Sequence, residues 1–207
     1  LDKTAPGAHF VKGMTAAAEK NYPEAESELK LAVQYNTNNS NYFYELGKVL
    51  YLQKKYTEAR KSFESAVQLD PKFANAQYNL GMTYEKLNQQ DSALTAYKKA
   101  VSINEGYAKA HLQIARIYSK KGDMDNAIKS YTSALQYDDG NLAAMKEIAS
   151  VYASQGNYAK AENYFKKALT FDPNDSTTQF NLAKVLSDDK KYSEALPYAK
   201  KAADSKP

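Results

Sequence analysis

The sequence predicts an all-α fold, a solenoid of stacked helix-turn-helix units, from three observations. A period of 34 residues runs along nearly the whole chain of 207 residues without an insertion or a deletion. Within each period apolar residues fall at helical spacing, and turn-forming residues return in one column between them. Each unit of such a chain can bury its apolar face only against its neighbours, so the units are expected to stack.

The first helix of each unit is marked by a large apolar residue followed by Gly or Ala. With Ser40 as position 1, positions 7 and 8 read Leu46-Gly47, Leu80-Gly81, Ile114-Ala115, Ile148-Ala149 and Leu182-Ala183. A small residue on one helix leaves a notch that a large residue of its neighbour can fill. We expect six units, beginning near Pro6, Ser40, Ala74, Ala108, Leu142 and Ser176.

The second helix carries alanine at positions 20 and 27 of every unit and a larger residue between them. Position 24 reads Leu29, Phe63, Tyr97, Tyr131, Phe165 and Ala199. Pro23 is expected at the first helical position, and Asp91-Ser92 is expected to cap its helix. Pro197 lies later in its helix, which predicts a kink or a shortened first turn there.

The turn between the two helices is predicted to contain one residue in the left-handed conformation. Asn88, Gly122 and Gly156 occupy that column, and both residue types tolerate the conformation. Lysine fills the same column at Lys20, Lys54 and Lys190 and is less suited to it. Between units, Asp70-Pro71, Asp139-Gly140 and Asp172-Pro173 are helix stops.

These columns resemble the tetratricopeptide repeat (TPR). The second unit carries its pattern most fully, with Phe43, Leu46, Gly47, Leu50, Ala59, Phe63, Ala66 and Pro71. The resemblance covers essentially the whole chain and implies a right-handed superhelical α-solenoid. It also implies a single domain over residues 1–207, with repeats near 6–39, 40–73, 74–107, 108–141, 142–175 and 176–207. The first copy departs from the pattern with Lys12 and Ala16, which suits an end repeat.

The composition bears on the compartment and source of the protein more than on its function. No apolar run is long enough to span a membrane, so we expect a soluble domain, either cytoplasmic or periplasmic. The absence of cysteine excludes disulfides. All but Arg60 and Arg116 of the 28 basic residues are lysine, and the abundance of Lys, Tyr and Asn suggests a bacterial source. The chain begins at Leu1 and ends on Pro207, and we expect a fragment of a longer protein.

The TPR resemblance implies that the first helices line a concave groove that binds a partner segment. The predicted groove residues are mainly aromatic, basic and amide-bearing, which favours a protein or peptide ligand with acidic and apolar residues. The alternative is that the rings pack along the inner helices and the lysines form a solvated face. The predicted residues are Phe10, Tyr44, Lys48, Asn75, Tyr78, Asn79, Met82, Lys109, Leu112, Gln113, Arg116, Lys146, Phe180, Asn181 and Lys184.

Three other kinds of site find little support in the sequence. Nothing resembles a catalytic nucleophile with its base or a phosphate-binding loop, so neither an enzyme nor a cofactor is expected. His9 and His111 share one column, but they are too few for a metal site. The formal net charge of +4 is scattered, which argues against dedicated nucleic-acid binding.

The function expected from the sequence is that of a scaffold or adaptor that binds a partner segment in the groove. Of the five residues with which TPR co-chaperones hold a carboxyl terminus, only Asn79 and Lys109 have counterparts, so a dedicated clamp is not expected. Two alternatives stay open. One is a structural scaffold that associates with itself as a homo-oligomer. The other is a substrate-docking region of a larger enzyme, for which Asn79 and Asn181 are the only support.

Overall fold

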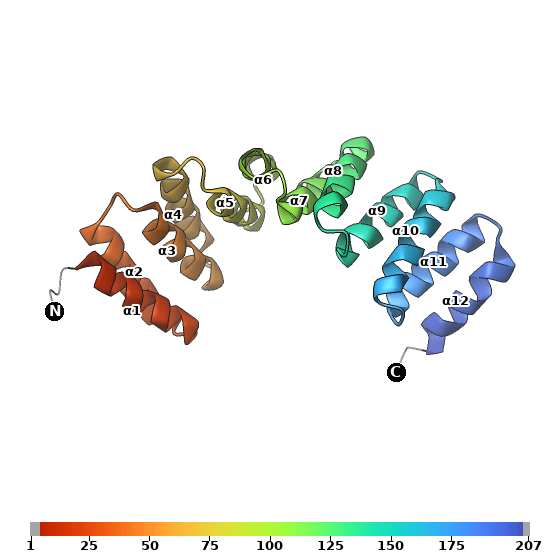
Figure 1. The fold of residues 1–207 in the computed structure, drawn as a ribbon, viewed down its shortest axis with the longest axis horizontal. Coiled ribbons are helices and arrows are strands. Elements are labelled where there is room, and N and C mark those ends of the chain that lie inside the picture. The colour runs from red at the N-terminus through yellow and green to blue at the C-terminus, as the bar shows by residue number, and fades with distance from the viewer. Residues whose placement is uncertain (1–4, 205–207) are drawn as a thin grey trace. The chain divides into compact units, whose positions relative to one another are not determined.

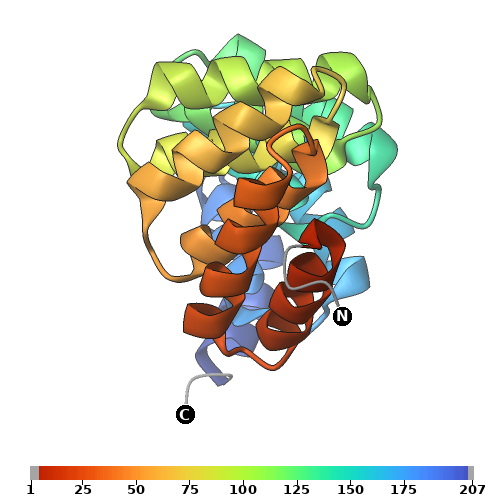
Figure 2. The same cartoon turned by 90° about the vertical axis from the view of Figure 1, so that its left-hand side faces the viewer.

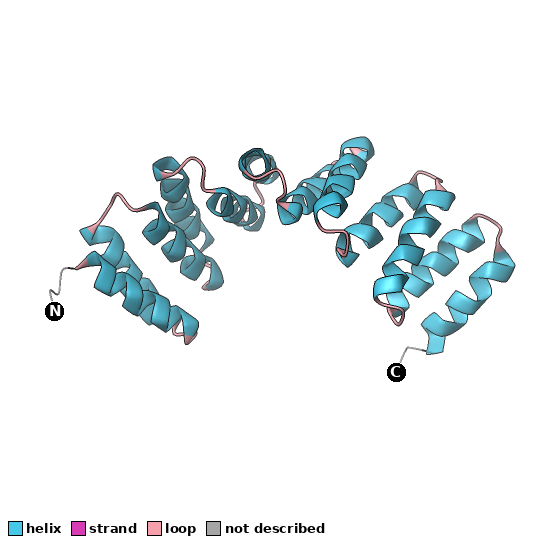
Figure 3. Ribbon diagram, viewed as in Figure 1, coloured by secondary structure: helices cyan, strands magenta, loops and turns pink. Residues whose placement is uncertain are grey.

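The structure, a computed structural model, describes residues 5–204, and that part of the chain folds into twelve α-helices without a strand (Figures 1 and 3). The first helices of the six repeats begin at a constant spacing of 34 residues. They are α1 (Pro6–Ala18), α3 (Ser40–Leu52), α5 (Ala74–Lys86), α7 (Ala108–Lys120), α9 (Leu142–Ser154) and α11 (Ser176–Asp188). The second helices are α2 (Tyr22–Tyr35), α4 (Tyr56–Leu69), α6 (Gln90–Ile103), α8 (Met124–Tyr137), α10 (Tyr158–Phe171) and α12 (Tyr192–Asp204). The predicted all-α fold and the six repeats are confirmed.

The helices pack into two compact units, residues 1–105 and residues 106–207. Each unit holds three helical hairpins, of which α1 and α2 at the start of the first unit are the example seen side by side in both views (Figures 1 and 2). The first unit buries one apolar cluster that includes Leu29, Leu50 and Phe63. The second buries another around Ile148 and Phe165. The single domain over the whole chain stays a prediction.

Notch packing within each hairpin explains the small residues at position 8. A Cβ atom on Gly47 would lie 2.7 Å from the ring of Phe63, and one on Gly81 would lie 2.6 Å from the ring of Tyr97. Both rings are buried. The close approach of the paired helices therefore depends on glycine at these two positions.

The turn column adopts the left-handed conformation in all six repeats. Gly122 and Gly156 have φ values of 78° and 73°. The other four residues are not glycine: Lys20, Lys54, Asn88 and Lys190 have φ between 58° and 62°. The lysines therefore adopt a conformation that their side chains disfavour.

The helix starts differ from the expectations in three places. Pro23 is the second residue of α2, because that helix begins at Tyr22. The expected cap at Asp91-Ser92 is wrong, since α6 begins at Gln90 and Asp91 lies in its first turn. Helix α12 begins at Tyr192 without a shortened start, and Pro197 lies inside it.

The side chains that do cap helices are Asn and Asp one position before the helix, which the sequence analysis missed. Each accepts a hydrogen bond from a backbone N–H of the first turn, as Asn and Asp at an N-cap commonly do. These caps are Asn21, Asn39, Asp123, Asn141, Asn157 and Asp175.

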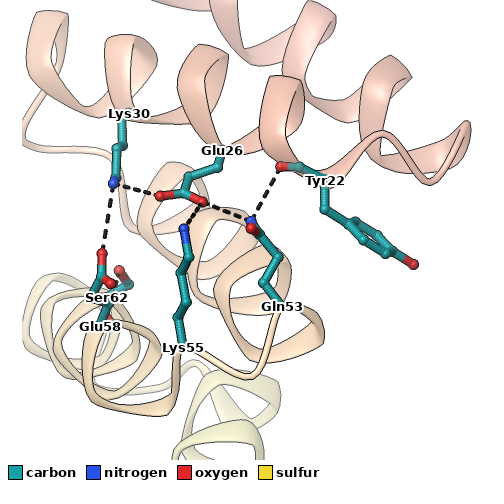
Figure 4. Close-up of polar contacts among 7 residues, drawn as sticks. All are labelled: Tyr22, Glu26, Lys30, Gln53, Lys55, Glu58 and Ser62. Atoms are coloured by element: carbon teal, nitrogen blue, oxygen red, sulfur yellow. Dashed lines mark hydrogen bonds and ion pairs between the residues drawn. The ribbon is translucent and has the colours of Figure 1, made fainter.

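A buried carboxylate joins the first two repeats (Figure 4). Glu26 of α2 accepts hydrogen bonds from Lys30 at 2.6 Å, from Lys55 at 2.7 Å and from Gln53 at 2.8 Å. Lys55 and Gln53 follow α3, so the carboxylate ties one repeat to the next. Burial alone would raise the pKa of Glu26, but the donors outweigh it and lower the pKa to about 2.

The same arrangement returns four repeats later, in the second unit. Glu162 of α10 accepts from Lys166 at 2.5 Å and from Lys191 at 2.9 Å. These two hydrogen bonds hold the pKa of Glu162 below its usual range. In both units, therefore, a carboxylate bound by two lysines ties one repeat to the next.

Candidate functional site

The first unit has a pocket on the first helices α3 and α5, which we call the α3–α5 pocket. Its volume is about 230 Å³. Helix α3 contributes three side chains, α5 contributes two, and the ring of Phe63 comes from α4. The lining residues are Lys48, Tyr51, Leu52, Phe63, Asn79 and Met82.

Tyr44 lies next to this pocket and is held by contacts on several sides. Its ring centre is 4.6 Å from that of Phe73 and 6.0 Å from that of Phe63. Asn79 donates a hydrogen bond to its hydroxyl at 3.2 Å. Burial raises the pKa of Tyr44, so the hydroxyl stays neutral at physiological pH. The expected alternative of ring packing along the inner helices therefore describes Tyr44 well.

The cation at the pocket, Lys48, is already partnered. Its Nζ lies 2.8 Å from a carboxylate oxygen of Glu45, one turn earlier on α3. The same Nζ is 5.1 Å from the centre of the Tyr44 ring. An acidic ligand would have to compete with Glu45 for this ammonium, so the pocket offers mainly apolar contact.

The second unit has a pocket at the equivalent place, two repeats further on. Its volume is about 530 Å³. Each residue of the α3–α5 pocket has a counterpart 68 positions later, and most of these counterparts are more polar: Arg116, Ser119, Lys120, Tyr131, Glu147 and Ser150. The fold therefore repeats the hollow while the sequence changes its chemistry.

Charged groups that line this second pocket pair with one another. Nη2 and Nε of Arg116 donate to the two carboxylate oxygens of Glu147 at 2.6 and 2.8 Å. The hydroxyl of Tyr131 donates to the same carboxylate at 3.0 Å, and burial raises the pKa of Tyr131. A bidentate guanidinium–carboxylate pair is among the stronger polar contacts in proteins, so these groups satisfy one another.

The remaining predicted groove residues differ in how much surface they offer. Leu112 is only 8% exposed and belongs to the core of the second unit. Phe10 stacks on Tyr42, with ring centres 4.7 Å apart. Phe180, in contrast, is 60% exposed.

Several of the other predicted residues contact a neighbouring side chain, and three are exposed. Tyr78 packs against Tyr97, with ring centres 5.5 Å apart, and Lys146 pairs with Asp175 at 2.9 Å. Gln113 accepts a hydrogen bond from Arg116 at 3.4 Å. Asn181 is partly buried, and Asn75, Lys109 and Lys184 are exposed.

The sequence analysis missed three residues of the α3–α5 pocket. Tyr51 and Leu52 follow the predicted residue Lys48 on α3 by three and four positions, so helical spacing from Lys48 would have found them. Phe63 fills the Gly47 notch, and nothing in the repeat pattern shows that its ring also lines a pocket.

Both histidines pack against a tyrosine ring. Within residues 5–204 no group of three His, Cys, Asp or Glu side chains could hold a metal ion. His9 lies 2.6 Å from Glu28 and stacks on Tyr35, and His111 stacks on Tyr137.

None of the described helices has the length and apolar character needed to cross a membrane.

Three family models match the chain along its repeats. One model, described as "Tetratricopeptide repeat", matches residues 106–174 and 141–207. A second with the same description matches residues 74–107. A third, described as "TPR repeat", matches residues 47–88. No curated protein sequence matches the chain.

Solved structures share the fold. The crystal structure of MamA is 25% identical, with a TM-score of 0.76 over 83% of this chain and 94% of that one. YrrB, described as a TPR protein with an unusual peptide-binding site, is 22% identical, with a TM-score of 0.73 over 86% and 91%. A tetratricopeptide repeat protein from Parabacteroides merdae is 20% identical, with a TM-score of 0.79 over 98% and 80%. The repeat spacing, the family models and these likenesses together show that the chain belongs to the tetratricopeptide repeat family, an α-solenoid fold of protein-interaction scaffolds.

Proposed function

We propose that this chain is a scaffold that binds a segment of a partner protein along the first helices of its first unit, with an apolar side chain of that segment in the α3–α5 pocket. The observation that carries the proposal is the pocket itself, which is lined mainly by apolar side chains and lies on the first helices, where the sequence analysis expected binding. Leu52 is 54% exposed at its edge, more than a side chain needed only for packing would be.

The chemistry of the pocket favours an apolar or aromatic anchor over an acidic one. Tyr51, Leu52 and Met82 give contact area, and a methionine adapts to ligands of different shape. The Asn79 amide can bond a peptide backbone. Because Lys48 already pairs with Glu45, an acidic residue of the partner would add little affinity.

The test selects peptides from a random displayed library on the 207-residue chain and measures their affinity by fluorescence anisotropy. Leu52→Asp should weaken the selected peptides by at least about tenfold, which corresponds to about 1.4 kcal/mol. The control is Leu69→Asp, since Leu69 is an exposed leucine on the second helix α4, outside the α3–α5 pocket. Equal binding by Leu52→Asp and the unchanged chain would overturn the α3–α5 pocket as the binding site.

The two alternative functions considered in the sequence analysis involve different parts of the chain. A substrate-docking region of a larger enzyme was suggested by Asn79, which lines the α3–α5 pocket, and by Asn181, which does not. A self-associating scaffold would use another surface, and the exposed apolar residues of the last repeat favour it.

A further inference from the structure

The last repeat lacks the residue that fills the notch in every earlier one. Position 24 holds a buried Leu, Phe or Tyr in the first five repeats: Leu29, Phe63, Tyr97, Tyr131 and Phe165. In the sixth repeat this position is Ala199, which is exposed. Two hollows of about 380 and 430 Å³ lie there, and Phe180 and Ala199 line both of them.

Large apolar side chains surround the second hollow. Phe180 is 60% exposed, Tyr192 is 64% exposed and Leu196 is 54% exposed, and all three line it. In the preceding repeat Tyr158 occupies the column of Tyr192 and is partly buried. Grouped apolar side chains with this exposure are typical of a surface that another protein covers. We call it the α11–α12 surface.

This surface is self-complementary. The exposed ring of Phe180 lies beside a hollow at the position where repeats two to five hold a buried Phe or Tyr ring. A two-fold axis between two copies would present each ring to the hollow of the other, as an isologous dimer requires. At its edge Lys184 and Asp188 stand one turn apart on α11. If the α11 helices of the two copies lie antiparallel, Lys184 of each copy faces Asp188 of the other.

The other end of the chain is a poor partner for the α11–α12 surface. Lys12 stands in α1 at position 7, where the five later repeats have a buried Leu or Ile. Head-to-tail stacking would therefore remove the charge of Lys12 from water, which costs free energy. The first and last repeats therefore differ in chemistry at these positions.

We propose that two copies of this chain bind each other through their α11–α12 surfaces, with Phe180 of each copy in the hollow beside Ala199 of the other. The dimer goes beyond the proposed scaffold function, because it uses a different repeat and different side chains. It would hold two α3–α5 pockets in one assembly and so make partner binding bivalent.

The test measures the mass of the 207-residue chain by sedimentation equilibrium over a range of concentrations. The unchanged chain should show a monomer–dimer equilibrium. Leu196→Asp should raise the dimer dissociation constant by at least about tenfold. Ala199→Phe should do the same by filling the hollow, while its helical content and melting temperature are kept or raised, so loss of the dimer cannot be ascribed to unfolding.

Two controls separate this proposal from its rivals. Val11→Asp changes a 63% exposed residue of α1 and should leave the dimer unchanged; weakening by Val11→Asp would indicate head-to-tail association instead. Leu52→Asp should weaken peptide binding and leave the dimer intact. A chain that stays monomeric at every concentration, or an Ala199→Phe variant that dimerises as well as the unchanged chain, would overturn the proposal.

Discussion

At the scale of single residues, the turn column shows backbone geometry prevailing over side-chain preference. Lys20, Lys54 and Lys190 adopt positive φ values because the repeat requires a left-handed residue there. For a side chain with a Cβ this conformation costs about 1 to 2 kcal/mol. The sequence predicted the conformation from the two glycines and the asparagine in the same column.

Lys54→Gly should stabilise the protein by about 0.5 to 1 kcal/mol. The relief of the left-handed strain exceeds the extra freedom that glycine gives the unfolded chain. Urea unfolding followed by circular dichroism measures the change. Lys61→Gly, at an exposed position inside α4, is the control and should destabilise by about 1 kcal/mol. A loss of stability from Lys54→Gly would show that Lys54 has a stabilising contact outweighing the strain.

Gly47→Leu should destabilise the protein by about 1 to 3 kcal/mol, because the Cβ alone would lie 2.7 Å from the buried ring of Phe63. Gly7→Leu serves as the control, since the nearest atom to a Cβ there is 3.9 Å away. Thermal unfolding of both variants checks the difference. Equal effects would mean that the notch can open at little cost.

At the scale of elements, the carboxylates of Glu26 and Glu162, which join repeats, are features that the sequence analysis did not foresee. Glu26 is 8% exposed, whereas glutamate is usually solvated. The signal was present, since a glutamate followed by lysines 4 and 29 residues later occurs at Glu26 and again at Glu162. It was not used, because a charge pair one turn apart on a helix is most often a solvated surface pair.

The Glu26 network predicts a stability that falls in acid. The pKa of Glu26 is about 2 in the folded protein against an ordinary value of 4.5, so the unfolded chain binds more protons between these values. Its contribution is complete above about pH 5 and disappears as the pH falls to about 2. At neutral pH, Glu26→Gln should therefore destabilise by about 1.5 to 3 kcal/mol.

Urea midpoints of the unchanged chain and of Glu26→Gln, measured from neutral pH down to about pH 2, test this prediction. The difference between the two proteins should shrink as the pH falls. Glu19→Gln, at an exposed glutamate after α1, should track the unchanged chain throughout. A difference for Glu26→Gln that stays constant with pH would mean that shape, not charge, explains its effect.

At the scale of the whole molecule, the sequence predicted the helical repeats better than the candidate site. Repeat starts follow from local pairs such as Leu46-Gly47, which carry their own packing information. The exposure of a side chain does not follow from its position in the repeat. Leu112 is buried and Phe180 is exposed, although both stand at position 5. Their environments depend on neighbouring repeats, and the pairing of Lys48 with Glu45 depends on side-chain geometry that no column shows.

The two compact units predict that each half of the chain folds by itself. The apolar cluster of the first unit lies within residues 16–96, and that of the second lies within residues 112–195. Each half has three hairpins, and about three repeats are the minimum for a stable stack. Residues 1–105 and residues 106–207, produced separately, should therefore both be helical and melt cooperatively by circular dichroism.

A fragment of residues 1–73 is the control for this prediction, because two repeats should fall below that minimum and melt without cooperativity. Halves that are unfolded while the 207-residue chain is folded would support the single domain expected from the sequence instead. Folded halves would permit a direct separation of the two proposals: residues 1–105 should bind the selected peptides, and residues 106–207 should dimerise.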